Sequence, residues 1–117
     1  MKQTDAERLE TIIRLWDELS VQLKMHGISP DMLLNDRYTQ WAVTTPLYNI
    51  GEQVYQLNTE FKEHYSGIPW NVVSGLRHRL VHNYEGINWS IIVEIVFHEM
   101  DVFINRIKEI VNTEAVS

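Results

Sequence analysis

The sequence predicts an all-α fold, an antiparallel bundle of four to five helices. Apolar residues recur at three- and four-residue spacing along most of the 117-residue chain, which is the pattern of amphipathic helices. No segment alternates apolar and polar residues between turn signals, as a half-buried strand would. The length and the absence of linkers or repeats suit one domain, so we expect residues 1–117 to form a single helical unit.

The first helix is expected to end at Gly27, and a short second helix follows it. The apolar stripe of the first helix contains Leu9, Ile12, Ile13, Trp16, Leu19 and Leu23. Thr4 and Glu7 have the spacing of a capping box at its start, and Gly27 suits its C-terminus. Ser29 and Pro30 suit the N-cap and the first position of the short helix.

A second long helical pattern runs from Asp36 to about Tyr65, with a proline inside it. Pro46 lacks a backbone N–H, and its ring clashes with the preceding turn. We therefore expect a kink near Ala42–Pro46 or a break into two helices.

Two further helices complete the predicted bundle. One extends from Pro69 to about Tyr84, and its apolar face contains Val72, Val73, Leu76 and Leu80. The other extends from about Trp89 to Val111, with Asn88 as its cap.

The composition excludes several classes of protein. The formal net charge of −6 argues against broad, sequence-independent binding to nucleic acid, although a local cationic cleft is compatible with it. The chain has no cysteine, so neither a disulfide nor a thiolate metal site is expected. The polar N-terminus is unlike a signal peptide and no apolar run reaches about 18 residues, so we expect a cytoplasmic protein without a membrane span.

One segment gathers side chains that suit catalysis. It reads "RHRLVHNY", from Arg77 to Tyr84, and contains two arginines, two histidines and a tyrosine. Cleaving RNA without a metal requires a base for the 2′-hydroxyl proton, a cation for the phosphoryl oxygens and an acid for the leaving oxygen. Histidine titrates near neutral pH and suits both proton transfers, whereas arginine presents a fixed planar charge to phosphate. Arg77 and His82 would supply these groups if they converge.

Helical geometry leaves an ordinary alternative open. Arg77 and His82 are five residues apart, which on a straight helix separates them by about 140°, a poor arrangement for direct cooperation. A fraying helix end, the reach of arginine or a second subunit would each bring them closer. The same residues also fit a simple helix end, where the macrodipole favours histidine and arginine is solvated.

The segment also matches the R-x4-H-x-Y pattern of HepT-like proteins, within the HEPN superfamily of small helical ribonucleases. The blocks "DRYTQWAV", "LYNIGEQV" and "IPWNVVSGLRHRLVHNYEGIN" resemble successive blocks of that family, in the same order and with similar spacing, over roughly residues 5–112. The sequence departs from the family pattern at His78, which replaces a more usual amide. It also departs at Thr44–Pro46, in place of a stretch with arginine and no proline, and at Tyr48.

The resemblance implies a homodimer that cleaves RNA with no metal and no cofactor, in a cleft where two motif-bearing helices meet. Arg77 and His82 are then the expected catalytic residues, with one His82 as base and its symmetry mate as acid. His78 and Arg79 are expected to have auxiliary catalytic or RNA-binding roles. Glu52 matches the family and either pairs with an arginine near the cleft or is an ordinary surface carboxylate.

The resemblance also implies a protein partner. Tyr84 matches the tyrosine to which, in toxin–antitoxin pairs of this family, a minimal nucleotidyltransferase antitoxin adds AMP. The leading hypothesis is therefore an endoribonuclease toxin of a type II or type VII-like system that cleaves cellular RNA, with tRNA as one candidate. An alternative is a noncatalytic helical module that binds a nucleotidyltransferase and presents Tyr84 or another substrate to it. A purely structural dimerisation bundle is the third hypothesis, and the clustering of functional side chains counts against it.

Overall fold

The structure is a computed structural model that describes residues 1–81 and 86–116, and its described residues form helices and loops without a strand. The elements are α1 (Gln3–Met25), α2 (Pro30–Asn35), α3 (Arg37–Gln56), α4 (Thr59–His64), α5 (Trp70–Arg79), α6 (Trp89–Glu94), the π-helical turn η2 (Ile95–Glu99) and α7 (Met100–Val116). The predicted all-α bundle is therefore confirmed. No helix in the described ranges is long and apolar enough to cross a membrane.

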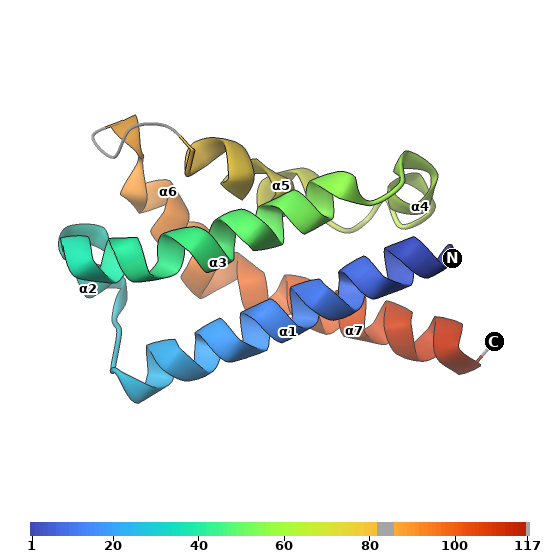
Figure 1. Ribbon diagram of the computed structural model, residues 1–117, viewed down its shortest axis with the longest axis horizontal. Coiled ribbons are helices and arrows are strands. Elements are labelled where there is room, and N and C mark those ends of the chain that lie inside the picture. The colour runs from blue at the N-terminus through green and yellow to red at the C-terminus, as the bar shows by residue number, and fades with distance from the viewer. Residues whose placement is uncertain (82–85, 117) are drawn as a thin grey trace.

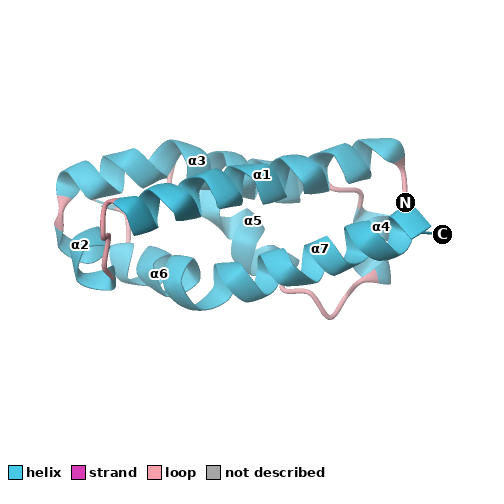
Figure 2. Cartoon of the chain, turned by 90° about the horizontal axis from the view of Figure 1, so that it is seen from below, coloured by secondary structure: helices cyan, strands magenta, loops and turns pink. Residues whose placement is uncertain are grey.

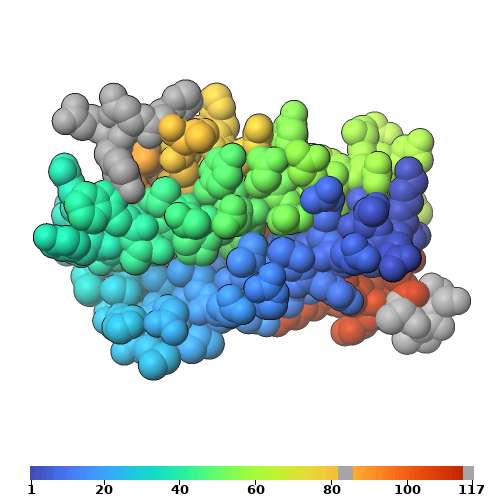
Figure 3. Space-filling view, viewed as in Figure 1, coloured from blue at the N-terminus to red at the C-terminus, as the bar shows by residue number. Residues whose placement is uncertain are grey.

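The long helices form two layers around one core. Helix α1 runs antiparallel to α3 on one side and to α7 on the other (Figure 1). Figure 2 shows α1 and α3 along one side of the bundle and α6 with α7 along the other, with α5 crossing between them. Helices α3 and α5 make the most extensive contact between two elements, which fixes α5 against the middle of the molecule. In the space-filling view of Figure 3, the yellow atoms of α5 lie against the green atoms of α3.

The core is formed by the apolar stripes of these helices. Its fully buried members include Leu9, Ile12, Leu47, Ile50, Leu76, Ile92, Phe103 and Ile107. Burying one such side chain contributes about 1.5–3 kcal/mol, so packing rather than helix propensity stabilises the bundle. On α5, Val73 and Leu76 lie in this core as expected, but Val72 is 39% exposed and does not.

Helix α1 does not begin with the expected capping box. Its N-cap is Lys2, which makes no side-chain cap, and Thr4 lies inside the helix. The start is instead held by the buried carboxylate of Asp5, which accepts hydrogen bonds from the backbone N–H of Asn58 at 3.0 Å and from its Nδ2 at 3.0 and 3.1 Å. A tertiary contact therefore replaces the local cap.

The end of α1 follows the prediction. Gly27 has a φ of +59°, in the left-handed region that favours glycine. The N–H of Ile28 donates to the carbonyl of Leu23 at 2.9 Å and that of Gly27 to Lys24 at 3.1 Å, which is the Schellman pattern. Ser29 then caps α2 by accepting from the N–H of Met32 at 3.1 Å, as expected.

The helical pattern expected from Asp36 to Tyr65 is interrupted, but the break that was one alternative near Ala42–Pro46 does not occur there. Helix α3 runs unbroken through Pro46, because Val43, Leu47 and Ile50 on either side of it share one buried stripe whose packing offsets the cost of about 3 kcal/mol. The helix ends at Gln56 because Leu57 turns to extended backbone and α4 begins two residues later. Lys62 of α4 donates to the last carbonyls of α3, as described below.

Helix α5 ends five residues earlier than predicted. Its last helical residue is Arg79, and Leu80 is the C-cap, with its N–H on the carbonyl of Leu76 at 3.0 Å. Tyr84, near which this helix was expected to end, lies outside the described residues. The last predicted helix contains the π-turn η2 between α6 and α7, which helical periodicity did not predict.

Candidate functional site

Arg77 is held at the closest approach of two helices. Gly51 of α3 is buried, and a β-carbon built on it would lie 2.6 Å from the backbone nitrogen of Arg77. The same β-carbon would lie 3.2 Å from the carbonyl oxygen of Val73 and 3.2 Å from the β-carbon of Leu76. Only glycine therefore lets the backbone of α5 come this near to α3, and the contact fixes where the Arg77 side chain starts.

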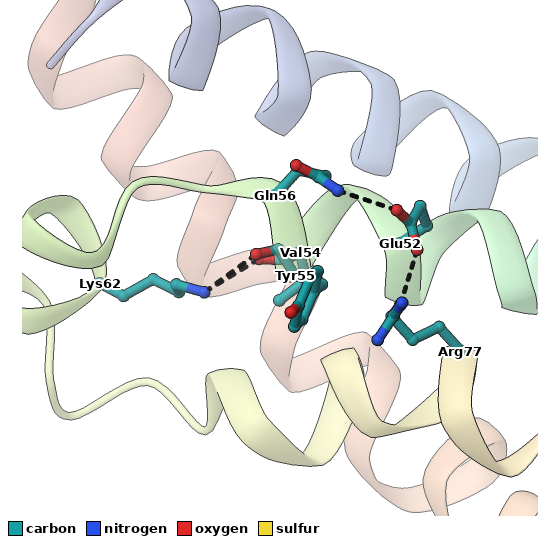
Figure 4. Close-up of polar contacts among 6 residues, drawn as sticks. All are labelled: Glu52, Val54, Tyr55, Gln56, Lys62 and Arg77. Atoms are coloured by element: carbon teal, nitrogen blue, oxygen red, sulfur yellow. Dashed lines mark hydrogen bonds and ion pairs between the residues drawn. The ribbon is translucent and has the colours of Figure 1, made fainter.

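The guanidinium of Arg77 is paired with the next residue of α3. Its Nε donates to Oε2 of Glu52 at 2.6 Å, and Oε1 of Glu52 accepts from Nε2 of Gln56 at 3.0 Å (Figure 4). The two charged side chains are 34% and 30% exposed, so the pair lies at the surface without being fully solvated. Because both carboxylate oxygens are engaged, the position of the guanidinium is defined by a chain of contacts along one face of α3.

Electrostatics keep this pair charged. The hydrogen bond from Gln56 and then that from Arg77 lower the pKa of Glu52 below its ordinary value. The hydrogen bond to Glu52 raises the pKa of Arg77. Arg8 of α1 adds a weaker attraction to Glu52, and its Nη1 donates to Oε1 of the neighbouring Gln53 at 3.1 Å. A carboxylate between two arginines stays ionised at neutral pH.

An aromatic ring completes the surroundings of Arg77. The guanidinium carbon lies 4.1 Å from the centre of the Tyr55 ring, which is the geometry of a cation–π contact. Tyr55 follows Glu52 by three residues on α3, so both side chains lie on the same face of the helix. Their contacts leave the two Nη groups of Arg77 without a hydrogen-bond partner among residues 1–81 and 86–116. These groups can form the bidentate contact that arginine makes with phosphate.

The structure pairs two of the predicted site residues and places two others at the surface. Arg77 and Glu52 are paired, whereas His78 and Arg79 are exposed on the last turn of α5. His82 and Tyr84 lie outside the described residues. Helix α5 ends at Arg79, so the angle of about 140° that a straight helix would place between Arg77 and His82 is not tested by the described residues.

Sequence reasoning missed Tyr55 and Gln56. Both lie one turn beyond Glu52, at the third and fourth positions after it, and this spacing was the available signal. This spacing alone does not indicate a site, because a tyrosine and a glutamine in an amphipathic helix are ordinary surface residues unless a partner helix lies beside them. Within the described part of the chain, no group of three or more histidines and carboxylates could hold a metal ion.

Known proteins resemble this chain along most of its length. A family model described as "Ribonuclease HepT-like" matches residues 4–110. A protein of Caldanaerobacter subterraneus subsp. tengcongensis, named "Putative RNase TTE0752", is 34% identical over 112 residues, which are 96% of this chain and 98% of the relative. No solved structure matches the chain.

Two archaeal relatives are similar to shorter parts of the chain. "Putative RNase MJ0127" of Methanocaldococcus jannaschii is 41% identical over 81 residues, which are 69% of this chain and 67% of the relative. "Probable ribonuclease HepT" of Thermococcus cleftensis is 29% identical over 99 residues, which are 82% of this chain and 86% of the relative.

Proposed function

The chain belongs to the HepT-like ribonuclease family, and on that premise we propose that it is an endoribonuclease that cleaves RNA without a metal ion, with Arg77 and His82 as catalytic residues. The observation that carries this proposal is the orientation of Arg77. Its Nε is bound to Glu52 and its ring contact is with Tyr55, while no described residue binds the Nη groups, which can therefore contact a phosphate. An arginine prepared in this way stabilises charge that develops in a transition state without first reorganising.

In the proposed reaction, a neutral His82 removes the proton of a ribose 2′-hydroxyl. The 2′-oxygen bonds to the phosphorus as the bond from phosphorus to the 5′-oxygen breaks, and a second, protonated His82 gives its proton to that leaving oxygen. The products are a 2′,3′-cyclic phosphate and a 5′-hydroxyl, so atoms and charge balance. Arg77 binds the nonbridging oxygens throughout.

We propose a homodimer because this reaction uses one histidine as base and another as acid. A two-fold axis through the cleft would supply the second His82 and a second Arg77. Val72 and Val81, 39% and 61% exposed near the two ends of α5, provide apolar surface for such a contact. Sedimentation showing only monomers at micromolar concentration would remove this composite site.

The proposed biological role is that of a toxin controlled by a partner. A minimal nucleotidyltransferase antitoxin would add AMP to Tyr84, in a type II or type VII-like system in the cytoplasm. His78 and Arg79, exposed beside Arg77, would contribute to RNA binding. The alternative role as a noncatalytic adaptor is less well supported, because an adaptor has no use for an arginine anchored by Glu52 and Tyr55.

The test is cleavage of single-stranded RNA by the purified chain in the presence of a chelator. Arg77→Ala and His82→Ala should each lower the rate by about 10²–10³-fold while the circular dichroism stays helical. Arg14→Ala is a matched control, because Arg14 is an exposed cation of α1 whose ion partner is Glu18. Unchanged cleavage by both site variants would show that the chemistry is elsewhere.

A further inference from the structure

Tyr55 is exposed although it lies beside the proposed catalytic arginine. Its neighbours Val54, on α3, and Leu57, just after that helix, are buried, whereas more than half of the Tyr55 side chain, 53%, is accessible. The guanidinium of Arg77 covers part of the ring at 4.1 Å, so the accessible part is the remainder of an aromatic surface that the core does not use. A tyrosine in this position has a large apolar face in water and a cation at its side.

A second cation lies beside the backbone of Tyr55. Nζ of Lys62 donates to the carbonyl oxygens of Val54 and Tyr55, each at 3.4 Å, and Figure 4 shows Tyr55 between Lys62 and Arg77. These two bonds use two of the three ammonium donors. The row Lys62–Tyr55–Arg77 therefore alternates a cation, an aromatic ring and a cation along the surface of α3, α4 and α5.

This alternation matches the chemistry of an unpaired RNA strand. Successive phosphates carry the charge, and the bases between them have flat aromatic faces. Proteins bind single strands by combining basic side chains for the phosphates with aromatic side chains on which bases stack. A base inside a duplex has both faces covered by its neighbours, so an aromatic platform selects RNA whose bases are free.

We propose that Tyr55 is a nucleobase-binding residue, on which a base next to the phosphate held by Arg77 stacks. The inference rests on the proposed ribonuclease function and deepens it, because it names unpaired RNA as the substrate class. The ring supplies stacking without reading a particular base, so the contact tolerates different sequences. Tyr55 also contacts the guanidinium of Arg77 and could therefore act by positioning that arginine. The experiment has to distinguish this positioning role from base stacking.

The experiment measures binding rather than cleavage. The probe is a fluorescein-labelled 2′-O-methyl oligouridine of about twelve nucleotides, which lacks the attacking hydroxyl, and affinity is read by anisotropy at several salt concentrations. Tyr55→Ala should weaken binding by about 5- to 140-fold, the range of one lost base stack. Tyr55→Phe should bind like the parent, because stacking uses the ring and not the hydroxyl. Tyr38→Ala is the control, since Tyr38 lies at the start of the same helix and is 76% exposed.

Two readouts separate stacking from an effect through Arg77. An abasic backbone of the same length should bind the parent and Tyr55→Ala equally, because it has no base to stack. The slope of log affinity against log salt should be unchanged in Tyr55→Ala and reduced by about 0.7 in Arg77→Ala, which removes one phosphate contact. A loss that is the same with the abasic probe, or a reduced slope in Tyr55→Ala, would overturn stacking.

The outcomes also distinguish this inference from the proposed function. Binding of the oligouridine with no dependence on Tyr55 would overturn the inference and leave the ribonuclease proposal intact. Binding that depends on Tyr55, together with no cleavage of the matching RNA with free 2′-hydroxyls, would overturn the ribonuclease proposal alone. Absence of any binding by the parent chain would overturn both.

Discussion

Gly51 and Arg77 are in contact through their backbones, and this contact joins the scaffold to the candidate site. The β-carbon that any other residue would carry at position 51 would lie 2.6 Å from the nitrogen of Arg77. The residue after Gly51 is Glu52, whose carboxylate holds the Arg77 guanidinium. Packing and site geometry are therefore set by two consecutive residues of α3.

Gly51→Ala should weaken both the fold and the site. The added methyl group meets backbone atoms of α5, which cannot rotate away as a side chain would, so α5 must shift. We expect a loss of about 1–3 kcal/mol in the free energy of unfolding, measured by urea denaturation, and weaker binding of RNA. Gly75→Ala is the control within α5, because the nearest atom to its β-carbon would be Nε of Arg79 at 4.0 Å. Gly75→Ala should be neutral or stabilising by up to about 1 kcal/mol. Equal effects of the two changes would contradict the close packing at Gly51.

Glu52→Ala should lower RNA cleavage by positioning Arg77 less well. Without its carboxylate partner the guanidinium has more rotamers available, and misplacement of a catalytic group costs about 10- to 100-fold in rate. Glu52→Gln should be milder, because an amide oxygen can still accept from Nε of Arg77. Glu60→Ala, an exposed carboxylate of α4, serves as the charge-matched control. A Glu52→Ala variant with full activity would show that Arg77 needs no partner from α3.

Acid should remove the contribution of Glu52 to stability. Its pKa in the folded chain is below the ordinary 4.5, because of hydrogen bonds from Gln56 and Arg77. A carboxylate with a depressed folded pKa stabilises the fold above its unfolded pKa, and this stabilisation is lost as the pH falls through the folded value. The difference in melting temperature between the parent and Glu52→Gln should therefore be full at neutral pH and shrink below pH 4.5. The comparison with Glu52→Gln is needed because Asp36 and Glu114 also have lowered pKa values. A melting-temperature difference that does not change with pH would mean that the charge of the Glu52 carboxylate does not stabilise the fold.

Much of this architecture was predictable from the sequence, because the spacing of apolar residues along a helix indicates which of its faces is buried. The stripes through Leu9, Leu47 and Leu76 gave the helices and their core faces, and glycine at position 27 marked a helix end through its own backbone preference. Of the two alternatives expected at Pro46, a kink or a break, the break does not occur, because tertiary packing outweighs the local cost of proline and a local sequence pattern does not report that packing.

The site was predictable only in part. Arg77 and Glu52 were recognised separately, from a motif and a family block, but their pairing depends on the distance between α3 and α5. Tyr55 carried no signal of its own, because its role follows from the guanidinium that another helix brings to it. A contact between residues 25 positions apart cannot be inferred from the sequence until the fold is known.

Asp5→Ala should destabilise the chain more than an ordinary surface change. The Asp5 carboxylate is 2% exposed and accepts the backbone N–H of Asn58, which would lose its partner. Leaving such a group unsatisfied costs about 1–3 kcal/mol, detectable by urea denaturation. Asp17→Ala is the control, because Asp17 is exposed and its ion pair with Lys108, at 3.5 Å, is worth at most about 1 kcal/mol. Similar losses in the two variants would argue against a structural role for the buried carboxylate.

Tyr84 should be the site of AMP addition if a nucleotidyltransferase partner controls the chain. AMP would bring one negative charge and a bulky nucleoside to the proposed cleft, where it would compete with substrate phosphate for Arg77. Incubation with the partner and ATP, followed by peptide mass spectrometry, should locate the adduct on Tyr84 and should find RNA cleavage reduced. Tyr84→Phe should escape this inhibition. An adduct confined to Tyr38, Tyr48, Tyr55 or Tyr65, or silencing of Tyr84→Phe by the partner, would contradict the mechanism.

The π-turn η2 makes the chain one residue longer than its core requires. Ile92 and Met100, both fully buried, are eight residues apart, the number taken up by one ordinary turn and one wide turn. In a uniform α-helix the residue aligned with Ile92 would be the seventh, Glu99, a carboxylate facing the core. Removing the exposed His98 would bring Met100 to that seventh place and leave the apolar side chains of α7 in phase with those of α6. We therefore expect the chain to tolerate deletion of His98, a kind of change that usually disrupts a helix, and circular dichroism of the deletion variant would check this.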